Sequence, residues 1–227
     1  MTWLFDHSGT RFKDYLIRWA SRRMAGRSNE FEILYILKDP WHLNLAKEQT
    51  RFDWTNQIIS AHFSRLDTIL EIGCGEGHQS QYLSQLCTGL YGIDLSKRAV
   101  KRARRRCPNS WFAVGDPFTF SFANMPPIVD LVVACEVLYY VDDIPQMIKR
   151  LSQLGRACLV TYYQGQAPQL DPHFSRLANC KQEQFRFDGT EWSAVWWRNP
   201  DIGDLSVKKA NDIPRSPLQK LSPSSAR

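Results

Sequence analysis

Short apolar runs alternate with polar stretches along most of the chain, which is typical of parallel strands covered by helices. Five apolar runs predict strands, at 69–72, 90–94, 111–116, 128–135 and 157–162. Three stretches carry apolar residues at helical spacing and predict helices, at 78–85, 97–106 and 143–154. This alternation predicts a doubly wound α/β fold with a mostly parallel sheet.

The last part of the pattern predicts a β-hairpin. Segments 183–187 and 190–198 have the character of strands, and the Asp188–Gly189 pair between them is typical of a hairpin turn. Because 192–197 is apolar on both faces, we expect this strand inside the sheet. The sheet would then have seven strands and an antiparallel C-terminal hairpin. We also expect a short helix at 174–178 and a helix stop at Gly155.

A glycine-rich loop follows the first predicted strand. Gly73, Gly75 and Gly77 stand on alternate positions, which lets the backbone turn sharply and approach a ligand without an intervening Cβ. Asp94 ends the second predicted strand, where an acid accepts hydrogen bonds from the ribose hydroxyls of an adenosine. The loop and the acid together predict an adenosine-bearing cofactor.

The spacing of the loop favours one class of cofactor. A dehydrogenase loop has the spacing G-x-G-x-x-G and binds a pyrophosphate, whereas here the spacing is G-x-G-x-G and Glu71 precedes it. A carboxylate at that position would repel a pyrophosphate but tolerates an amino group and a sulfonium. With these residues the chain resembles the class I S-adenosylmethionine-dependent methyltransferases, whose first motif is E/D-x-G-x-G-x-G.

This resemblance covers about residues 40–198 and implies a Rossmann-like methyltransferase fold with S-adenosylmethionine as methyl donor and S-adenosylhomocysteine as product. It places Asp94 in the second motif of the family. It also implies that Asp116, after the third strand, meets the adenine amino group. We assign four neighbours of these motifs to the same cofactor site, and interpret the two cysteines among them as small packing residues: Cys74, Leu95, Pro117 and Cys135.

The segment around Trp41 carries a second, narrower resemblance. The sequence from Asp39 to Trp41, followed by Glu48 and Arg51, is similar to the opening segment of a small bacterial subfamily that includes the nodulation-factor N-methyltransferase. The resemblance implies that this segment covers the cofactor, with Trp41 stacked near it and Arg51 reaching its methionine portion. The alternatives are a core aromatic for Trp41 and a surface ion pair with Glu48 or Asp53 for Arg51.

The fourth predicted strand places the catalytic candidates. Glu136 and Tyr139 follow its carboxyl end, where ligands bind in open α/β sheets. An amine acceptor must lose its proton before it attacks a methyl group, and Glu136, His42 or a bridging water could take that proton; we favour Glu136. The alternatives are that the Glu136 carboxylate bonds only loop N–H groups, and that Tyr139 packs in a helix.

Charge and composition narrow the acceptor. The net charge is +6, and the run 97–106 alone supplies seven positive charges. Because apolar residues recur in this run at helical spacing, we interpret it as a surface helix with a solvated basic face; phosphate binding is the alternative. We therefore expect a small-molecule acceptor, an amine or a hydroxyl. The alternatives are a methyltransferase of RNA or another nucleic acid, and a catalytically silent S-adenosylmethionine-binding protein.

Length and cysteine usage set the remaining expectations. The 227 residues, 43% of them hydrophobic, suffice for one domain with a real core. The six cysteines have no C-x-x-C spacing, so we expect no disulfide framework and no metal site. Without a signal-like or membrane-spanning apolar run, we expect a cytoplasmic protein, monomeric or homodimeric. The expected parts are an N-terminal helical cap segment, the methyltransferase domain and a disordered tail, at 1–45, 46–198 and 199–227.

Overall fold

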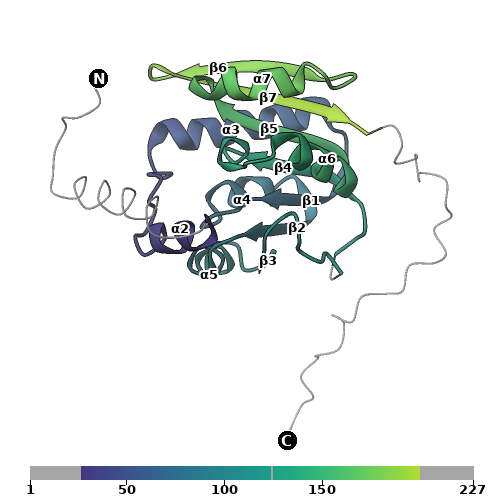
Figure 1. The fold of residues 1–227 in the computed structure, drawn as a ribbon. Helices are drawn as coiled ribbons and strands as arrows, with labels where there is room; N and C mark the ends of the chain where they lie inside the picture. The colour runs from purple at the N-terminus through teal and green to yellow at the C-terminus, as the bar shows by residue number, and fades with distance from the viewer. Residues whose placement is uncertain (1–26, 124, 200–227) are drawn as a thin grey trace, which may run out of the picture.

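A seven-stranded sheet forms the centre of the part of the chain that the computed structural model describes, residues 27–123 and 125–199. The strand order is β3-β2-β1-β4-β5-β7-β6 (Figure 1). β7 lies between β5 and β6 and pairs antiparallel with both, and the other pairs are parallel. The predicted fold class and the interior position of the last strand are confirmed. The strands are β1 (Leu66–Ile72), β2 (Cys87–Asp94), β3 (Trp111–Val114), β4 (Val129–Cys135), β5 (Gly155–Tyr163), β6 (Lys181–Phe187) and β7 (Thr190–Arg198).

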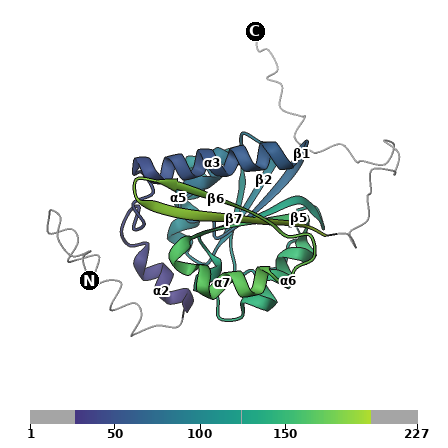
Figure 2. The ribbon, with the colours of Figure 1, turned by 90° about the horizontal axis from the view of Figure 1, so that it is seen from above.

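Helices cover both faces of the sheet. On one face lie α3 and α4, and on the other lie α6 and α7 (Figure 2). Their bounds, with those of α2, α5 and the short 3-10 helices, are α2 (Arg27–Leu34), α3 (Ala46–His62), α4 (His78–Leu83), α5 (Lys97–Arg106), η1 (Leu138–Tyr140), α6 (Ile144–Leu154), η2 (Gln164–Gln166) and α7 (Ala167–Phe174). The N-terminal stretch and the tail expected before 27 and after 199 lie outside the described residues.

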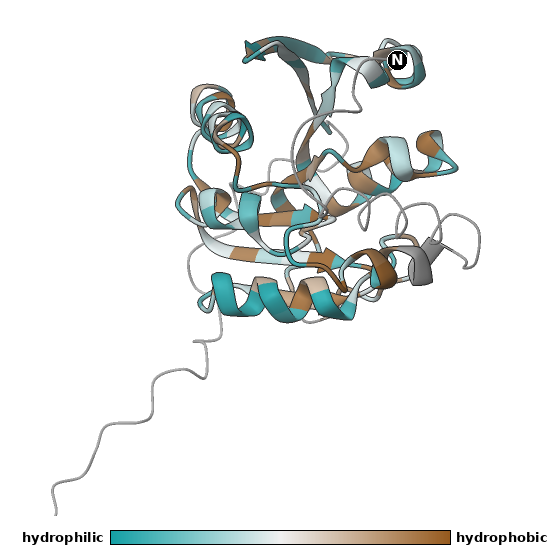
Figure 3. Cartoon of the chain, turned by 90° about the vertical axis from the view of Figure 1, so that its left-hand side faces the viewer, coloured by the Kyte–Doolittle hydropathy of each residue, from teal (hydrophilic) through white to brown (hydrophobic). Residues whose placement is uncertain are grey.

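The core explains why the central strands are apolar without interruption. Along β4, Leu131 and Val133 pack against the α3 side, and Val132 and Ala134 pack against the α6 side. Successive side chains of a strand point to opposite faces, so a strand covered on both faces must be apolar at every position. Figure 3 shows brown, apolar residues in these strands, whereas the helices carry both colours. Each buried Val or Leu side chain of this kind contributes about 1.5–3 kcal/mol to the free energy of unfolding.

One local prediction is confirmed in position and one is wrong. Gly155 follows the last residue of α6, as predicted, but its backbone is extended and not left-handed. It also begins β5, where a Cβ would lie 2.6 Å from Cγ2 of Val132. The glycine is needed for close packing of neighbouring strands. The short helix is α7, Ala167–Phe174, and not 174–178. Pro168 lies in its first turn, where a missing N–H costs no helical hydrogen bond.

The basic helix α5 binds the segment that follows α2. Arg102 forms an ion pair with Glu76 of the glycine loop and donates hydrogen bonds to the backbone oxygens of Tyr35 and Leu37, at 2.9 and 2.6 Å. Glu76 also accepts the backbone N–H of Asp39 at 3.1 Å. Other arginines of the helix act in the same way: Arg98 pairs with Glu32, Arg104 donates to the Phe112 carbonyl, and Arg106 donates to the Glu76 carbonyl. Four of the seven basic residues of the run therefore bond to other groups of the protein.

Within the described ranges, no helix is both long and apolar enough to cross a lipid bilayer.

The contacts of Arg102 predict that the segment 31–43 depends on this side chain. Replacing Arg102 with Met removes its hydrogen bonds and leaves the buried Glu76 carboxylate uncompensated, which costs about 1–3 kcal/mol locally. Amide hydrogen exchange should rise several-fold in 31–43 and stay unchanged in β4 and β5. Lys101→Met on the exposed side of the same helix is the matched control. Equal protection of 31–43 in both variants would contradict this account.

Candidate active site

A cavity of about 990 Å³ opens at the carboxyl ends of β1, β2 and β4. Its walls come from the segment after α2, the first turns of α3, the glycine loop, the loop after β4 and the tip of the β6–β7 hairpin. Most of the predicted site residues line it: Trp41, Arg51, Glu71, Gly73, Cys74, Gly75, Asp94, Leu95, Asp116, Pro117, Cys135, Glu136 and Tyr139. The sheet thus brings residues from distant parts of the sequence to one place.

Two predicted site residues lie outside the lining of this cavity. His42 is exposed in the loop before α3, with a backbone φ of 57°. Gly77, with a φ of 81°, packs against α5: a Cβ at this position would lie 3.0 Å from Cα of Ala103. The third glycine of the motif therefore lets the loop lie closer to α5 than a larger residue would without strain.

Asp94 fixes the glycine loop. Its carboxylate accepts the backbone N–H of Gly75 and that of Ser96, each at 2.9 Å. Gly75 has a φ of 51°, and a Cβ there would lie 2.9 Å from the Tyr35 hydroxyl oxygen. Burial raises the pKa of Asp94 to about 6, against the lowering effect of the two N–H donors. The result is bare backbone beside an acid, at the place where the sequence predicts a ribose.

Glu71 is a buried acid at the end of β1, with a side chain that lines the cavity. The Ser80 hydroxyl donates a hydrogen bond to its carboxylate. Burial raises its pKa to about 8, and the charges of Asp94 and Arg51 act in opposite directions on it. The carboxyl group is therefore protonated at neutral pH and will ionise when a cation arrives beside it.

Arg51 and Gln79 bring buried donors to the cavity. Only 2% of Arg51 is exposed; its Nε lies 2.9 Å from Oε2 of Glu48, and its Nη1 lies 3.4 Å from Oε1 of Gln79. The ion pair with Glu48, an alternative in the sequence analysis, is present but buried. Nε2 of Gln79 is also buried and has no hydrogen-bond partner among the described residues. A buried N–H group without a partner is costly, so this amide is suited to an anionic ligand group.

The Glu136 carboxylate is held from three sides. The hydroxyl groups of Tyr139 and Thr161 donate to it at 3.0 and 3.2 Å, and the backbone N–H of Tyr163 donates at 3.0 Å. It therefore bonds more than loop N–H groups. Burial raises its pKa, while Arg51 and the Tyr139 hydroxyl oppose that shift. Glu136 has a φ of 59°, a left-handed conformation that costs a non-glycine residue about 1 kcal/mol and is typical of functional sites.

Several lining residues were not predicted. Phe31 and Tyr35 come from the segment after the start of α2, Gln79 from the start of α4, and Tyr163 and Trp192 from the ends of β5 and β7. These residues belong to no short sequence motif, because each reaches the cavity through the position of its helix or strand in the fold. The four-residue spacing of Phe31 and Tyr35 in an apolar run is a signal of one shared helical face.

Comparisons with known proteins give this chain relatives among methyltransferases. Residues 70–157 match the family described as "Methyltransferase domain". The chain is 33% identical over 126 residues to nodulation protein S of Sinorhizobium fredii, which covers 51% of this chain and 55% of that protein. It is 35% identical over 118 residues to nodulation protein S of Bradyrhizobium diazoefficiens, which covers 48% and 52%. The chain spans about half the length of the curated relatives it matches.

The fold has a solved counterpart. The crystal structure of N-methyltransferase NodS from Bradyrhizobium japonicum, in complex with S-adenosyl-L-homocysteine, matches with a TM-score of 0.62 at 22% identity. The match covers 81% of this chain and 98% of that chain. Residues 70–157 therefore match a methyltransferase domain, and the chain resembles nodulation protein S in part of its sequence and in its fold.

Proposed function

We propose that this protein transfers a methyl group from S-adenosylmethionine to the nitrogen of a small-molecule amine. The observation that carries the proposal is the Glu136 carboxylate, held at the carboxyl end of β4 in the same cavity as the glycine loop and Asp94. The solved relative is an N-methyltransferase, which supports nitrogen as the acceptor atom.

The residues present fit the donor. Asp94 would accept hydrogen bonds from the ribose hydroxyls, and Asp116 would accept one from the adenine amino group. Glu71 would pair with the amino group of the methionine portion. Arg51 and the unpartnered Gln79 amide would bind its carboxylate. The unpartnered amide and the cradle of bare glycine backbone are the features of this chain that support this placement.

The protein's work in the reaction is alignment and proton removal. The donor supplies a methyl group that is already activated by its sulfonium. An ammonium has no lone pair, so the acceptor amine must be unprotonated when it attacks. Glu136 would take that proton, since burial makes its carboxylate more basic and its three donors hold it in one orientation. Binding in the cavity would align the two reactants and displace water from between them.

The acceptor would bind on the β5–β7 side of the cavity. Tyr163, Gly189, Thr190 and Trp192 line this side, and the strand order places β5 and β7 on the opposite side of β4 from the glycine loop. Glu136, at the end of β4, lies between the two regions. The wall is partly aromatic and of limited size, which supports a small acceptor. The nucleic-acid alternative loses support because Arg98, Arg102, Arg104 and Arg106 of α5 are already bonded to other groups of the protein.

The role of Glu136 can be tested by substitution. Glu136→Gln keeps the size of the side chain but cannot take a proton, so kcat with an amine acceptor should fall at least 100-fold. The Kd for S-adenosylhomocysteine, measured by titration calorimetry, should change less than about threefold. Glu183→Gln, an exposed residue of β6, serves as control. Full turnover by Glu136→Gln would remove the proposed base, and absence of methyl transfer to any amine by the wild-type protein would remove the proposed function.

The burial of Glu71 predicts proton release on cofactor binding. With a pKa of about 8 in the free protein, the group is mostly protonated at pH 7 and must ionise to pair with the cofactor's amino group. Affinity for S-adenosylhomocysteine should therefore rise with pH between 6.5 and 8, by about fivefold per unit. Asp94 titrates near 6, below this window. Calorimetry in buffers of different ionisation enthalpy should show about one proton released at pH 7, and none for Glu71→Gln. A flat profile in the wild-type protein would refute the pairing.

A further inference from the structure

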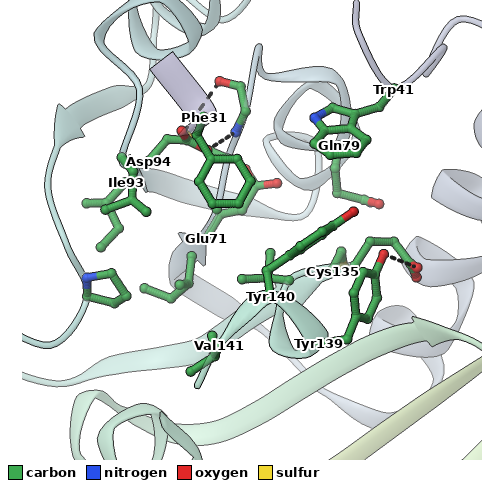
Figure 4. A pocket seen from close by; sticks show the side chains of 18 of the residues that line it. Phe31, Trp41, Glu71, Gln79, Ile93, Asp94, Cys135, Tyr139, Tyr140 and Val141 are labelled. Atoms are coloured by element: carbon green, nitrogen blue, oxygen red, sulfur yellow. Dashed lines mark hydrogen bonds between the residues drawn. The ribbon is translucent and has the colours of Figure 1, made fainter. Parts of the chain in front are cut away.

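Four aromatic side chains gather over the middle of the cavity; we call Phe31, Trp41, Tyr139 and Tyr140 the aromatic band (Figure 4). The Tyr140 ring contacts the other three, with centroid separations of 5.7 Å to Phe31, 5.6 Å to Trp41 and 4.6 Å to Tyr139. Two of these residues come from the segment around α2 and α3, and two from the short helix η1 after β4. The band thus joins the two walls of the cavity.

The band spans the interval between the two ends of the cofactor site. In Figure 4, Phe31 lies beside Asp94, Trp41 lies beside Gln79, and Tyr140 lies between them. In S-adenosylmethionine the sulfur lies between the ribose and the amino-acid portion and joins them. If the ribose binds at Asp94 and the methionine carboxylate at Arg51 and Gln79, as the proposed function holds, the sulfonium falls in the interval that Tyr140 crosses.

Two of the four rings are held in place by hydrogen bonds at their polar ends. Nε1 of Trp41 donates to the Tyr35 hydroxyl oxygen at 3.1 Å, and the Tyr139 hydroxyl donates to Glu136 at 3.0 Å. Tyr35 is itself buried. A ring anchored in this way keeps its face in one direction, and the negative face of an aromatic ring attracts a cation in a site shielded from water.

The carboxylates near this interval are already engaged. Glu136 accepts three hydrogen bonds and faces the buried charge of Arg51. Glu71 accepts a bond from Ser80 and is assigned to the amino group. Both acids therefore have other partners, and the four ring faces, which bear no formal charge, offer a second means of attracting a cation.

We propose that the aromatic band recognises the positive charge of the sulfonium, so that the protein binds the methyl donor more tightly than the demethylated product. This inference rests on the proposed function. Methyl transfer converts the sulfonium to a neutral thioether, and the attraction to the rings ends with the transfer. The band then favours exchange of product for fresh donor at equal concentrations of the two.

Titration calorimetry with S-adenosylmethionine and S-adenosylhomocysteine tests the inference. The wild-type protein should prefer the donor by about 5- to 30-fold, the range of a cation–π contact in a desolvated site. Tyr140→Leu and Trp41→Leu should each reduce this preference about threefold or more, and Tyr140→Phe should keep it. Phe187→Leu, an exposed aromatic of β6 outside the cavity, is the control.

The outcomes separate the inference from the function. The proposed role of the aromatic band would be overturned if Tyr140→Leu and Trp41→Leu lowered the affinity for both ligands equally. It would also be overturned if the preference for the donor survived in these two variants but was lost in Glu136→Gln. A wild-type protein that binds both ligands with equal affinity would overturn it as well and leave the methyltransferase proposal standing. A wild-type protein that binds neither ligand would end both proposals.

Discussion

The hydrogen bonds that the Asp94 carboxylate accepts from the backbone N–H groups of Gly75 and Ser96 are the contacts on which the rest of the site depends. They fasten the glycine loop to the end of β2, so the bare backbone and the acid are held in one arrangement. Ser96 then extends the connection in two directions. Its hydroxyl caps α5 by accepting the N–H of Ala99, and it donates to Glu32 of α2. One carboxylate therefore links the glycine loop, the basic helix and α2.

The site keeps groups whose burial costs stability. Glu71, Arg51 and Gln79 are each at least nine-tenths buried, and an amide N–H of Gln79 lacks a partner among the described residues. A core built for stability alone would replace them with apolar residues. Glu136 adds a left-handed backbone conformation. Such costs persist where a ligand recovers them on binding, and they coincide here with the cavity.

The sequence was sufficient for the sheet and for the residues of the glycine motif, because both depend on local patterns. Period and apolarity identified every strand, and the spacing of Gly73, Gly75 and Asp94 identified residues that the fold brings together in the cavity. The position of Gly155 at the end of α6 was predicted, whereas its packing against Val132 of a neighbouring strand was not. The aromatic residues of the cavity were only partly predicted. Phe31 and Tyr163 reach it through tertiary packing, which leaves no short motif in the sequence.

The insertion of β7 between β5 and β6 has a consequence for folding. Until residues 190–198 have left the ribosome, β5 exposes an apolar edge with free backbone N–H and C=O groups, and β6 has no neighbour in the sheet. An unpaired apolar edge is prone to join other chains. The nascent polypeptide thus passes through a stage in which strands β1 to β5 are complete while the outer edge of β5 is still unpaired. Chaperone demand during synthesis should be concentrated there.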